Sequence, residues 1–107
     1  MPWVNAFSTD EIEPDDVKRF DYDGKTYAIY RTEDDEFYCS DGLCTHEQVH
    51  LADGLLVGLE IECPKHNGRF DVRTGEARCR PATLRLQTFP AREADGRVWV
   101  DLPSASG

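Results

Sequence analysis

Residues 41–71 read DGLCTHEQVHLADGLLVGLEIECPKHNGRFD and contain two cysteine–histidine pairs. The pairs are Cys44-Thr-His46 and Cys63-Pro-Lys-His66, with residues 47–62 between them. Thiolates and imidazoles both bind transition metals, and the short spacing lets both side chains of a pair point into one cavity. A lone cysteine or histidine is usually an ordinary residue. Two such pairs, with Pro64 and Gly68 beside the second, predict a metal centre with mixed ligands from two loops.

Two kinds of metal centre fit this ligand set. Two thiolates and two imidazoles satisfy tetrahedral zinc, so a zinc-bound interaction module is one alternative. Structural zinc sites, however, usually take two cysteines from one knuckle and two histidines from another. A mixed pair from each loop suits a two-iron cluster in which one iron takes both cysteines and the other takes both histidines. The spacing therefore favours a [2Fe–2S] cluster over zinc.

The pattern Cys-x-His followed by Cys-x-x-His resembles the Rieske signature. The resemblance extends through residues 63–71 to the turn Arg73-Thr-Gly75 and to Pro81-Ala82. It implies an all-β Rieske fold of three antiparallel sheets and one [2Fe–2S] cluster per chain. It also implies which residues bind the cofactor: Cys44 and Cys63 on the inner iron, His46 and His66 on the outer, more exposed iron.

Differences from the high-potential Rieske proteins of cytochrome bc complexes indicate which branch of the Rieske family this chain resembles. Those proteins carry an additional cysteine in each cluster loop, and the two cysteines form a disulfide. Here the corresponding residues 46–49 contain no cysteine, and residues 63–65 contain only the predicted ligand Cys63. The high-potential proteins also place a serine and a tyrosine where this chain has Gly68 and Phe70. Hydrogen bonds to sulfur raise the potential of a cluster, so their loss predicts a potential in the lower part of the Rieske range. This pattern resembles the soluble ferredoxins of bacterial ring-hydroxylating oxygenase systems.

The resemblance implies an electron carrier rather than an enzyme. Such a ferredoxin passes single electrons from a flavin-dependent NAD(P)H reductase to a terminal Rieske oxygenase, and both contacts are transient. The alternative is the Rieske-like small subunit of a nitrite reductase. A terminal oxygenase is excluded because its mononuclear iron needs two more histidines and a carboxylate, and only His50 is left over.

The flanking sequence predicts a regular β scaffold around an irregular insert. Alternating residues predict strands over 17–22, 26–30, 83–89 and 98–102, and Asp23-Gly24 predicts a tight hairpin turn. Shorter strands are expected over 36–39, 59–62 and 69–72, with one helical turn near Thr9 to Ile12. We expect a single domain, 1–107, with a cluster-binding subdomain over about 41–82.

Charge and composition limit the partners that the protein can bind and the compartment in which it can work. The net charge of −9 disfavours binding to nucleic acid or to an anionic membrane surface. No segment approaches the ~20 apolar residues that span a bilayer, and the N-terminus lacks the pattern of a secretory signal. These features predict a cytoplasmic protein, which we also expect to be a monomer.

Several residues near the predicted ligands need their own interpretation. Cys39 and Cys79 are expected to be small buried hydrophobic residues rather than a disulfide. His50 is expected to be a solvated loop residue, with a role in docking or proton transfer as the alternative. The predicted rim of contact around the outer iron consists of Leu43, Glu47, Leu51, Pro64 and Lys65.

Overall fold

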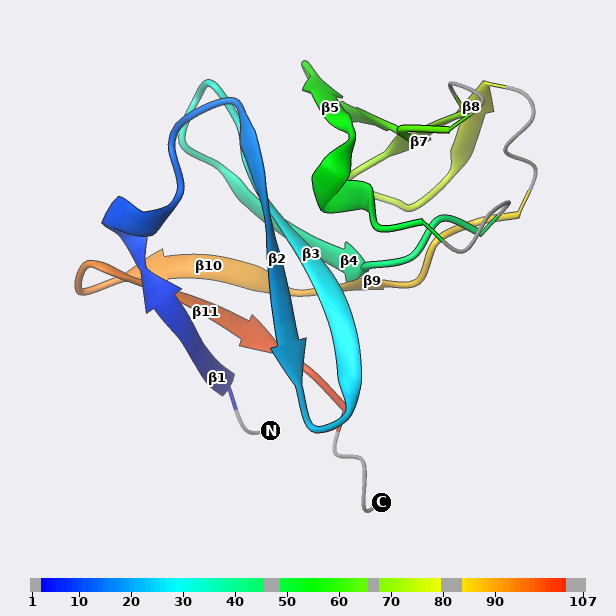
Figure 1. The fold of residues 1–107 in the computed structure, drawn as a ribbon. Coiled ribbons are helices and arrows are strands. Elements are labelled where there is room, and N and C mark those ends of the chain that lie inside the picture. The colour runs from blue at the N-terminus through cyan, green and yellow to red at the C-terminus, as the bar shows by residue number, and fades with distance from the viewer. Residues whose placement is uncertain (1–2, 46–48, 66–67, 80–83, 104–107) are drawn as a thin grey trace.

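The computed structural model describes residues 3–45, 49–65, 68–79 and 84–103. Apart from two short 3-10 turns, its regular structure is β-strand, arranged in three antiparallel sheets. Figure 1 shows the sheet formed by the middle of the chain at one end of the molecule, apart from the two sheets formed by the remaining strands. The predicted fold class, all-β with three antiparallel sheets, is confirmed.

The first sheet joins the two ends of the chain. Its order is β1-β11-β10, so the N-terminal strand pairs with the last strand. The bounds are β1 (Trp3–Ser8), β10 (Ala91–Ala94) and β11 (Arg97–Asp101). The 3-10 turn η1 (Thr9–Glu11) follows β1, and Ser8 caps it in a capping box with Glu11. The predicted helical turn is therefore present, in its 3-10 form.

The second sheet contains the predicted hairpin. Its order is β2-β3-β4-β9, with bounds β2 (Asp16–Tyr22), β3 (Lys25–Arg31), β4 (Phe37–Asp41) and β9 (Thr88–Phe89). Asp23 and Gly24 form the turn between β2 and β3 with φ values of 52° and 82°. Positive φ at both central residues is the geometry whose twist matches that of the flanking strands. The Asp-Gly prediction is confirmed.

The third sheet is built from short strands. Its order is β5-β6-β7-β8, with bounds β5 (Leu55–Val57), β6 (Glu60–Glu62), β7 (Arg69–Asp71) and β8 (Ala77–Cys79). A second 3-10 turn, η2 (Leu51–Asp53), precedes β5. The sequence predicted β6 and β7, and its turn at 73–75 between two short strands implied the strand that follows, β8; it did not predict η2 or β5.

Strand β3 separates two hydrophobic cores. Tyr27 and Ile29 point into a base core shared by the first two sheets, whereas Ala28 and Tyr30 point into a second core beneath the third sheet. Successive side chains of a strand face opposite sides, so a strand buried on both faces has a nearly continuous apolar run. We call the second cluster the ligand-side core, because it contains Cys44 and Cys63; its other members are Ala28, Tyr30, Leu51, Leu56, Ile61, Phe70, Val72 and Leu86.

The predicted strand over 83–89 is mostly wrong. Only Thr88–Phe89 is a strand, while 84–87 has no regular pairing and residue 83 lies outside the described residues. The two leucines of the alternation do not share a buried face, since Leu86 is 1% exposed and Leu84 is 65% exposed. The Leu86 N–H donates to the Gly75 carbonyl, and Thr45 Oγ1 donates to the Leu84 carbonyl. The backbone of this segment therefore bonds to neighbouring loops rather than to a strand.

Candidate metal centre

Two loops carry the predicted ligands, and both close in the same way. The first ligand loop, residues 44–49, follows β4; the second, residues 63–68, joins β6 to β7. In the first, the Cys44 N–H donates to the Val49 carbonyl over 3.0 Å. In the second, the Cys63 N–H donates to the Gly68 carbonyl over 2.7 Å. Each cysteine thus opens a hairpin loop that returns five residues later.

The predicted histidine ligands fall within these two loops by sequence. His46 and His66 both lie outside the described residues, as do Glu47 and Gln48. Of the four predicted ligands, the structure therefore brings together the two cysteines in one core and leaves the two histidines undescribed.

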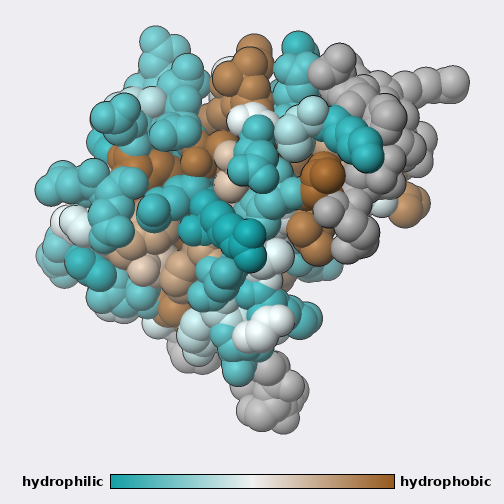
Figure 2. Space-filling model, in the orientation of Figure 1, coloured by the Kyte–Doolittle hydropathy of each residue, from teal (hydrophilic) through white to brown (hydrophobic). Residues whose placement is uncertain are grey.

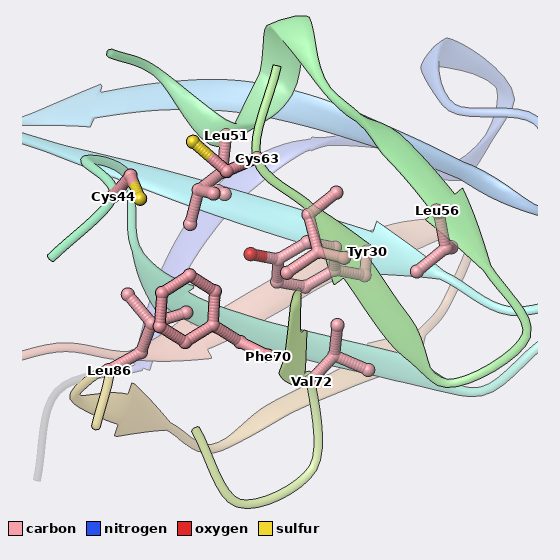
Figure 3. Close-up of a cluster of buried hydrophobic side chains, with 10 residues drawn as sticks. Tyr30, Cys44, Leu51, Leu56, Cys63, Phe70, Val72 and Leu86 are labelled. Atoms are coloured by element: carbon pink, nitrogen blue, oxygen red, sulfur yellow. The ribbon is translucent and has the colours of Figure 1, made fainter. Parts of the chain in front are cut away.

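Both cysteines are buried in the ligand-side core. Cys44 is 3% exposed and Cys63 is 1% exposed. Figure 3 shows them at one side of this core, beside Leu51, with Phe70 and Leu86 below them. A thiolate is costly in apolar surroundings unless a positive group neutralises it. Two cysteines that separate loops bring into one core could therefore supply two of the four ligands of a cationic metal centre.

Neighbouring segments hold the first ligand loop in place. Its base is tied to β3, because the Gly42 N–H donates to the Thr26 carbonyl over 3.0 Å. The returning arm pairs with the outgoing arm through a bridge between Leu43 and His50, and the Leu51 N–H donates to the Gly42 carbonyl over 2.7 Å. Thr45 then attaches the loop to the segment around Leu84 through its hydroxyl.

His50 is not the solvated loop residue that the sequence predicted. Only 7% of it is exposed, and its Nδ1 accepts a hydrogen bond from the Ala52 N–H over 2.9 Å. It caps η2, a short turn with no clear signal in the sequence. Burial is the main cause of a pKa below the usual value of 6.5 for histidine. The imidazole is therefore neutral at pH 7.

The predicted rim is only partly correct. Pro64 and Lys65 are exposed and Leu43 is half-buried, but Leu51 is fully buried. Leu51 is buried because the hydrogen bond to Gly42 turns its side chain into the ligand-side core. Exposed apolar side chains that the sequence did not single out are Leu55 (61%), Val57 (42%) and Leu84 (65%). Figure 2 shows apolar residues in separate patches among polar ones on the face in view.

The remaining cysteines fit the sequence interpretation as far as they are described. Cys39 is 1% exposed in the base core and is a free thiol. Burial in apolar surroundings raises its pKa far above the usual range for a thiol. The backbone of Cys79 ends β8, and its side chain lies outside the described part of the structure.

Within the described ranges, no helix is both long and apolar enough to cross a membrane.

Comparison with known proteins identifies the family. The model of the Rieske [2Fe-2S] domain matches residues 2–90. The ferredoxin component of the naphthalene 1,2-dioxygenase system of Pseudomonas aeruginosa is 45% identical over 100 residues, which cover 94% of this chain and 95% of that protein. The chain belongs to the Rieske [2Fe–2S] domain family. Its cofactor is therefore a Rieske-type [2Fe–2S] cluster.

Solved structures place this Rieske domain among ferredoxins. The ferredoxin of carbazole 1,9a-dioxygenase from Nocardioides aromaticivorans IC177 superposes with a TM-score of 0.87 at 32% identity, covering 94% of this chain and 97% of that one. A chain from the complex of reduced oxygenase and oxidized ferredoxin in carbazole 1,9a-dioxygenase superposes with a TM-score of 0.85 at 33% identity. The match covers 92% of this chain and 91% of that chain. The NADH-dependent nitrite reductase small subunit from Mycobacterium tuberculosis superposes with a TM-score of 0.85 over 97% of each chain, but at only 17% identity. This match therefore shows a shared fold and nothing more.

The ligand-side core suits the charge of a Rieske cluster. The oxidised [2Fe–2S] core carries two positive charges, so two thiolates bring the site to neutrality. A neutral group is tolerated among Leu51, Phe70 and Leu86, where an isolated charge is not. Phe70 is 0% exposed and lies on β7, directly after the second ligand loop, where it offers no hydroxyl to a sulfur atom. The residues of this Rieske domain therefore fit the group that its family carries.

Proposed function

We propose that Cys44, His46, Cys63 and His66 hold the cluster, within a cluster-binding subdomain over about 41–82. The support for the cysteines is their burial in one core and the matching closure of their loops. The support for the histidines is their spacing from those cysteines in the sequence. Cys44 and Cys63 would hold the inner iron, and His46 and His66 the outer iron.

The molecule is an electron-transfer protein of the ferredoxin type, and we propose that it serves a ring-hydroxylating oxygenase system. The observation that carries this function is 45% identity to a ferredoxin component over almost the full length of both chains. A Rieske cluster supplies one-electron chemistry between its diferric and mixed-valence forms. The chain itself excludes water from the cysteine side through Leu51, Phe70 and Leu86, and exposes Pro64 and Lys65 beside the second loop.

The partners that we propose are a flavin-dependent NAD(P)H reductase and a terminal Rieske oxygenase. A ferredoxin similar to this chain has been solved in complex with an oxygenase, which supports the second partner. Electrons would enter and leave at the end of the molecule that carries the two ligand loops. We propose that these contacts are transient, that the protein is a monomer, and that it works in the cytoplasm.

The small subunit of a nitrite reductase is the weaker alternative. Its likeness to this chain is in fold, at an identity of 17%, whereas the ferredoxin components share up to 45%. No observation on the described residues favours it over the ferredoxin.

Counting electrons tests the function. Anaerobically purified protein, titrated with dithionite and followed by visible absorption, should take up one electron per chain. The reduced protein should then be reoxidised by the terminal oxygenase of a naphthalene 1,2-dioxygenase system. Uptake of no electron, or reduction without any transfer to a ring-hydroxylating oxygenase, would contradict the proposed function. A matched control is Cys44→Ala, which should take up no electron.

A further inference from the structure

The His50 ring is enclosed at the base of the first ligand loop. Its Nδ1 accepts from the Ala52 N–H over 2.9 Å, and its Nε2 lies 2.8 Å from Thr26 Oγ1. A Cβ atom built on Gly42 would lie 2.6 Å from Nε2, so the ring packs directly against the backbone of the outgoing arm. Both ring nitrogens and one ring face are therefore in contact with neighbouring elements.

The hydrogen bonds around the ring fix its tautomer. The Thr26 hydroxyl donates its single hydrogen to Asp21 Oδ1 over 2.6 Å. Since Nδ1 is an acceptor, the ring proton is on Nε2 and is donated to Thr26 Oγ1. Arg19 holds the Asp21 carboxylate from the other side, with its Nε 3.0 Å from Oδ1. A continuous chain of hydrogen bonds thus runs from η2 through His50 and β3 to β2.

The backbone of His50 directly follows the first ligand loop, which carries two of the predicted ligands. It bridges to Leu43, next to Cys44, and so closes the base of that loop. The ring then ties this loop to the β2–β3 hairpin through Thr26. His50 is therefore the residue at which the first ligand loop is attached, by backbone and by side chain, to the scaffold.

We propose that His50 is a positioning residue of the cluster site, whose neutral ring holds the first ligand loop on β3 and whose uptake of a proton is coupled to reduction of the cluster. The inference rests on the proposed function. A proton can be added only at Nδ1, where it removes the acceptor for the Ala52 N–H. Proton uptake therefore breaks the cap of η2 at the base of the ligand loop.

The surrounding charges set the protonation of His50 at pH 7, and the electron added on reduction determines the sign of this coupling. Burial and Arg19 on β2 lower the pKa of His50, whereas Asp53 on η2 and Asp21 on β2 raise it; the net shift is downward. The ring thus stays neutral at pH 7 and takes up a proton only in the acid range. Reduction adds one electron, which takes the site from neutral to a charge of −1. A negative site favours the imidazolium, so the pKa of His50 is higher in the reduced protein, and the midpoint potential rises as the pH falls.

The test compares midpoint potentials of the holoprotein by protein-film voltammetry from about pH 5 to about pH 7.5. His50→Asn is the informative variant, because its amide oxygen can replace Nδ1 as acceptor but the side chain cannot take up a proton. We expect the native midpoint to rise on acidification and that of His50→Asn to stay flat with its cluster loaded. The same pH profile in both proteins would overturn the proposal.

Proton uptake by the native protein provides a second measurement that does not depend on a variant. Reduction in weakly buffered solution with an indicator dye should take up a fraction of a proton per electron on the acid side of the usual histidine pKa and none near pH 7.5. Absence of uptake throughout the acid range in which the cluster stays loaded would overturn the coupling and leave the proposed function intact. Absence of iron and sulfide would instead contradict the proposed function itself.

Discussion

At the scale of single residues, we expect few side-chain hydrogen-bond donors to reach the cluster from the positions of Gly68 and Phe70. Both are buried, and neither side chain carries a hydroxyl. Sulfur atoms without donors keep more negative charge, which disfavours the added electron. We expect a midpoint near or below ~−150 mV, the lower end of the Rieske range. We also expect little dependence on pH around neutrality, since His50 is already neutral there.

Gly68→Ser tests this interpretation. If the added hydroxyl donates to a sulfur atom, the midpoint potential should rise, as measured by protein-film voltammetry at pH 7. Gly68→Ala is the matched control, because it adds the same Cβ without a donor and should leave the potential almost unchanged. An equal change in both variants would mean that the effect is steric, and no change in Gly68→Ser would mean that the hydroxyl points elsewhere.

His50 and Leu51, whose exposure the sequence predicted wrongly, show that burial cannot be predicted from the residue type at a single position. His50 and Leu51 stand in a loop rich in polar residues, so the sequence predicted that both were exposed. Their burial depends on hydrogen bonds to Thr26 and Gly42, which are close only because the first ligand loop folds onto β3. The shared position of Cys44 and Cys63 in one core was easier to anticipate, because their pairing with histidines is visible in the spacing of the sequence alone.

At the scale of elements, the turn between β7 and β8 anchors the segment that also bonds to the first ligand loop at Thr45. Gly75 has a φ of +81°, and a Cβ atom there would collide with the Leu86 carbonyl. That carbonyl belongs to the residue whose N–H donates to Gly75 over 2.7 Å. A side chain at Gly75 would therefore break the attachment of Leu86, a member of the ligand-side core.

We predict that Gly75→Ala lowers the free energy of unfolding by about 3 kcal/mol or more, from the left-handed backbone and the collision together. Gly96→Ala is the matched control, because Gly96 has a similar φ of +77° but nothing within 4 Å of its Cβ position. It should cost about 1 kcal/mol. Urea titrations of the holoproteins measure both changes. Equal losses in the two variants would show that the contact with Leu86 contributes nothing.

The elements differ in how well local sequence predicts them. The β2–β3 hairpin follows from Asp23-Gly24 and its flanking alternation, because the turn and the strands need no distant partner. Strand β1 follows from no such pattern, since it exists through pairing with β11 near the other end of the chain. Residues 84–87 alternate like a strand but bond to loops at Thr45 and Gly75. Local patterns therefore predict hairpins well and segments with remote partners poorly.

At the scale of the whole molecule, the two cores differ in their dependence on the cluster. The base core contains no predicted ligand, whereas the ligand-side core contains Cys44 and Cys63. Metal-ligand bonds contribute directly to folding where the ligands belong to the core. We therefore expect loss of the cluster to loosen the third sheet and both ligand loops more than the first two sheets.

Cys63→Ala tests this difference by hydrogen exchange. The variant should lose the cluster and exchange faster over about 41–82, while β1, β10 and β11 stay protected. Cys39→Ala is the control, because it removes a buried thiol from the base core and should keep the cluster. Equal protection of both regions after cluster loss would contradict the prediction.

The central claim is a Rieske cluster held by two cysteines and two histidines, and pulsed EPR tests it most directly. Protein labelled with ¹⁵N in its histidines, purified anaerobically and reduced with dithionite, should show two histidine nitrogens coupled to the cluster spin. The His50→Asn variant should show the same two couplings, because His50 is not a ligand. A signal without nitrogen coupling would indicate a cluster held only by cysteines. Stoichiometric zinc with no signal at all would contradict the account entirely.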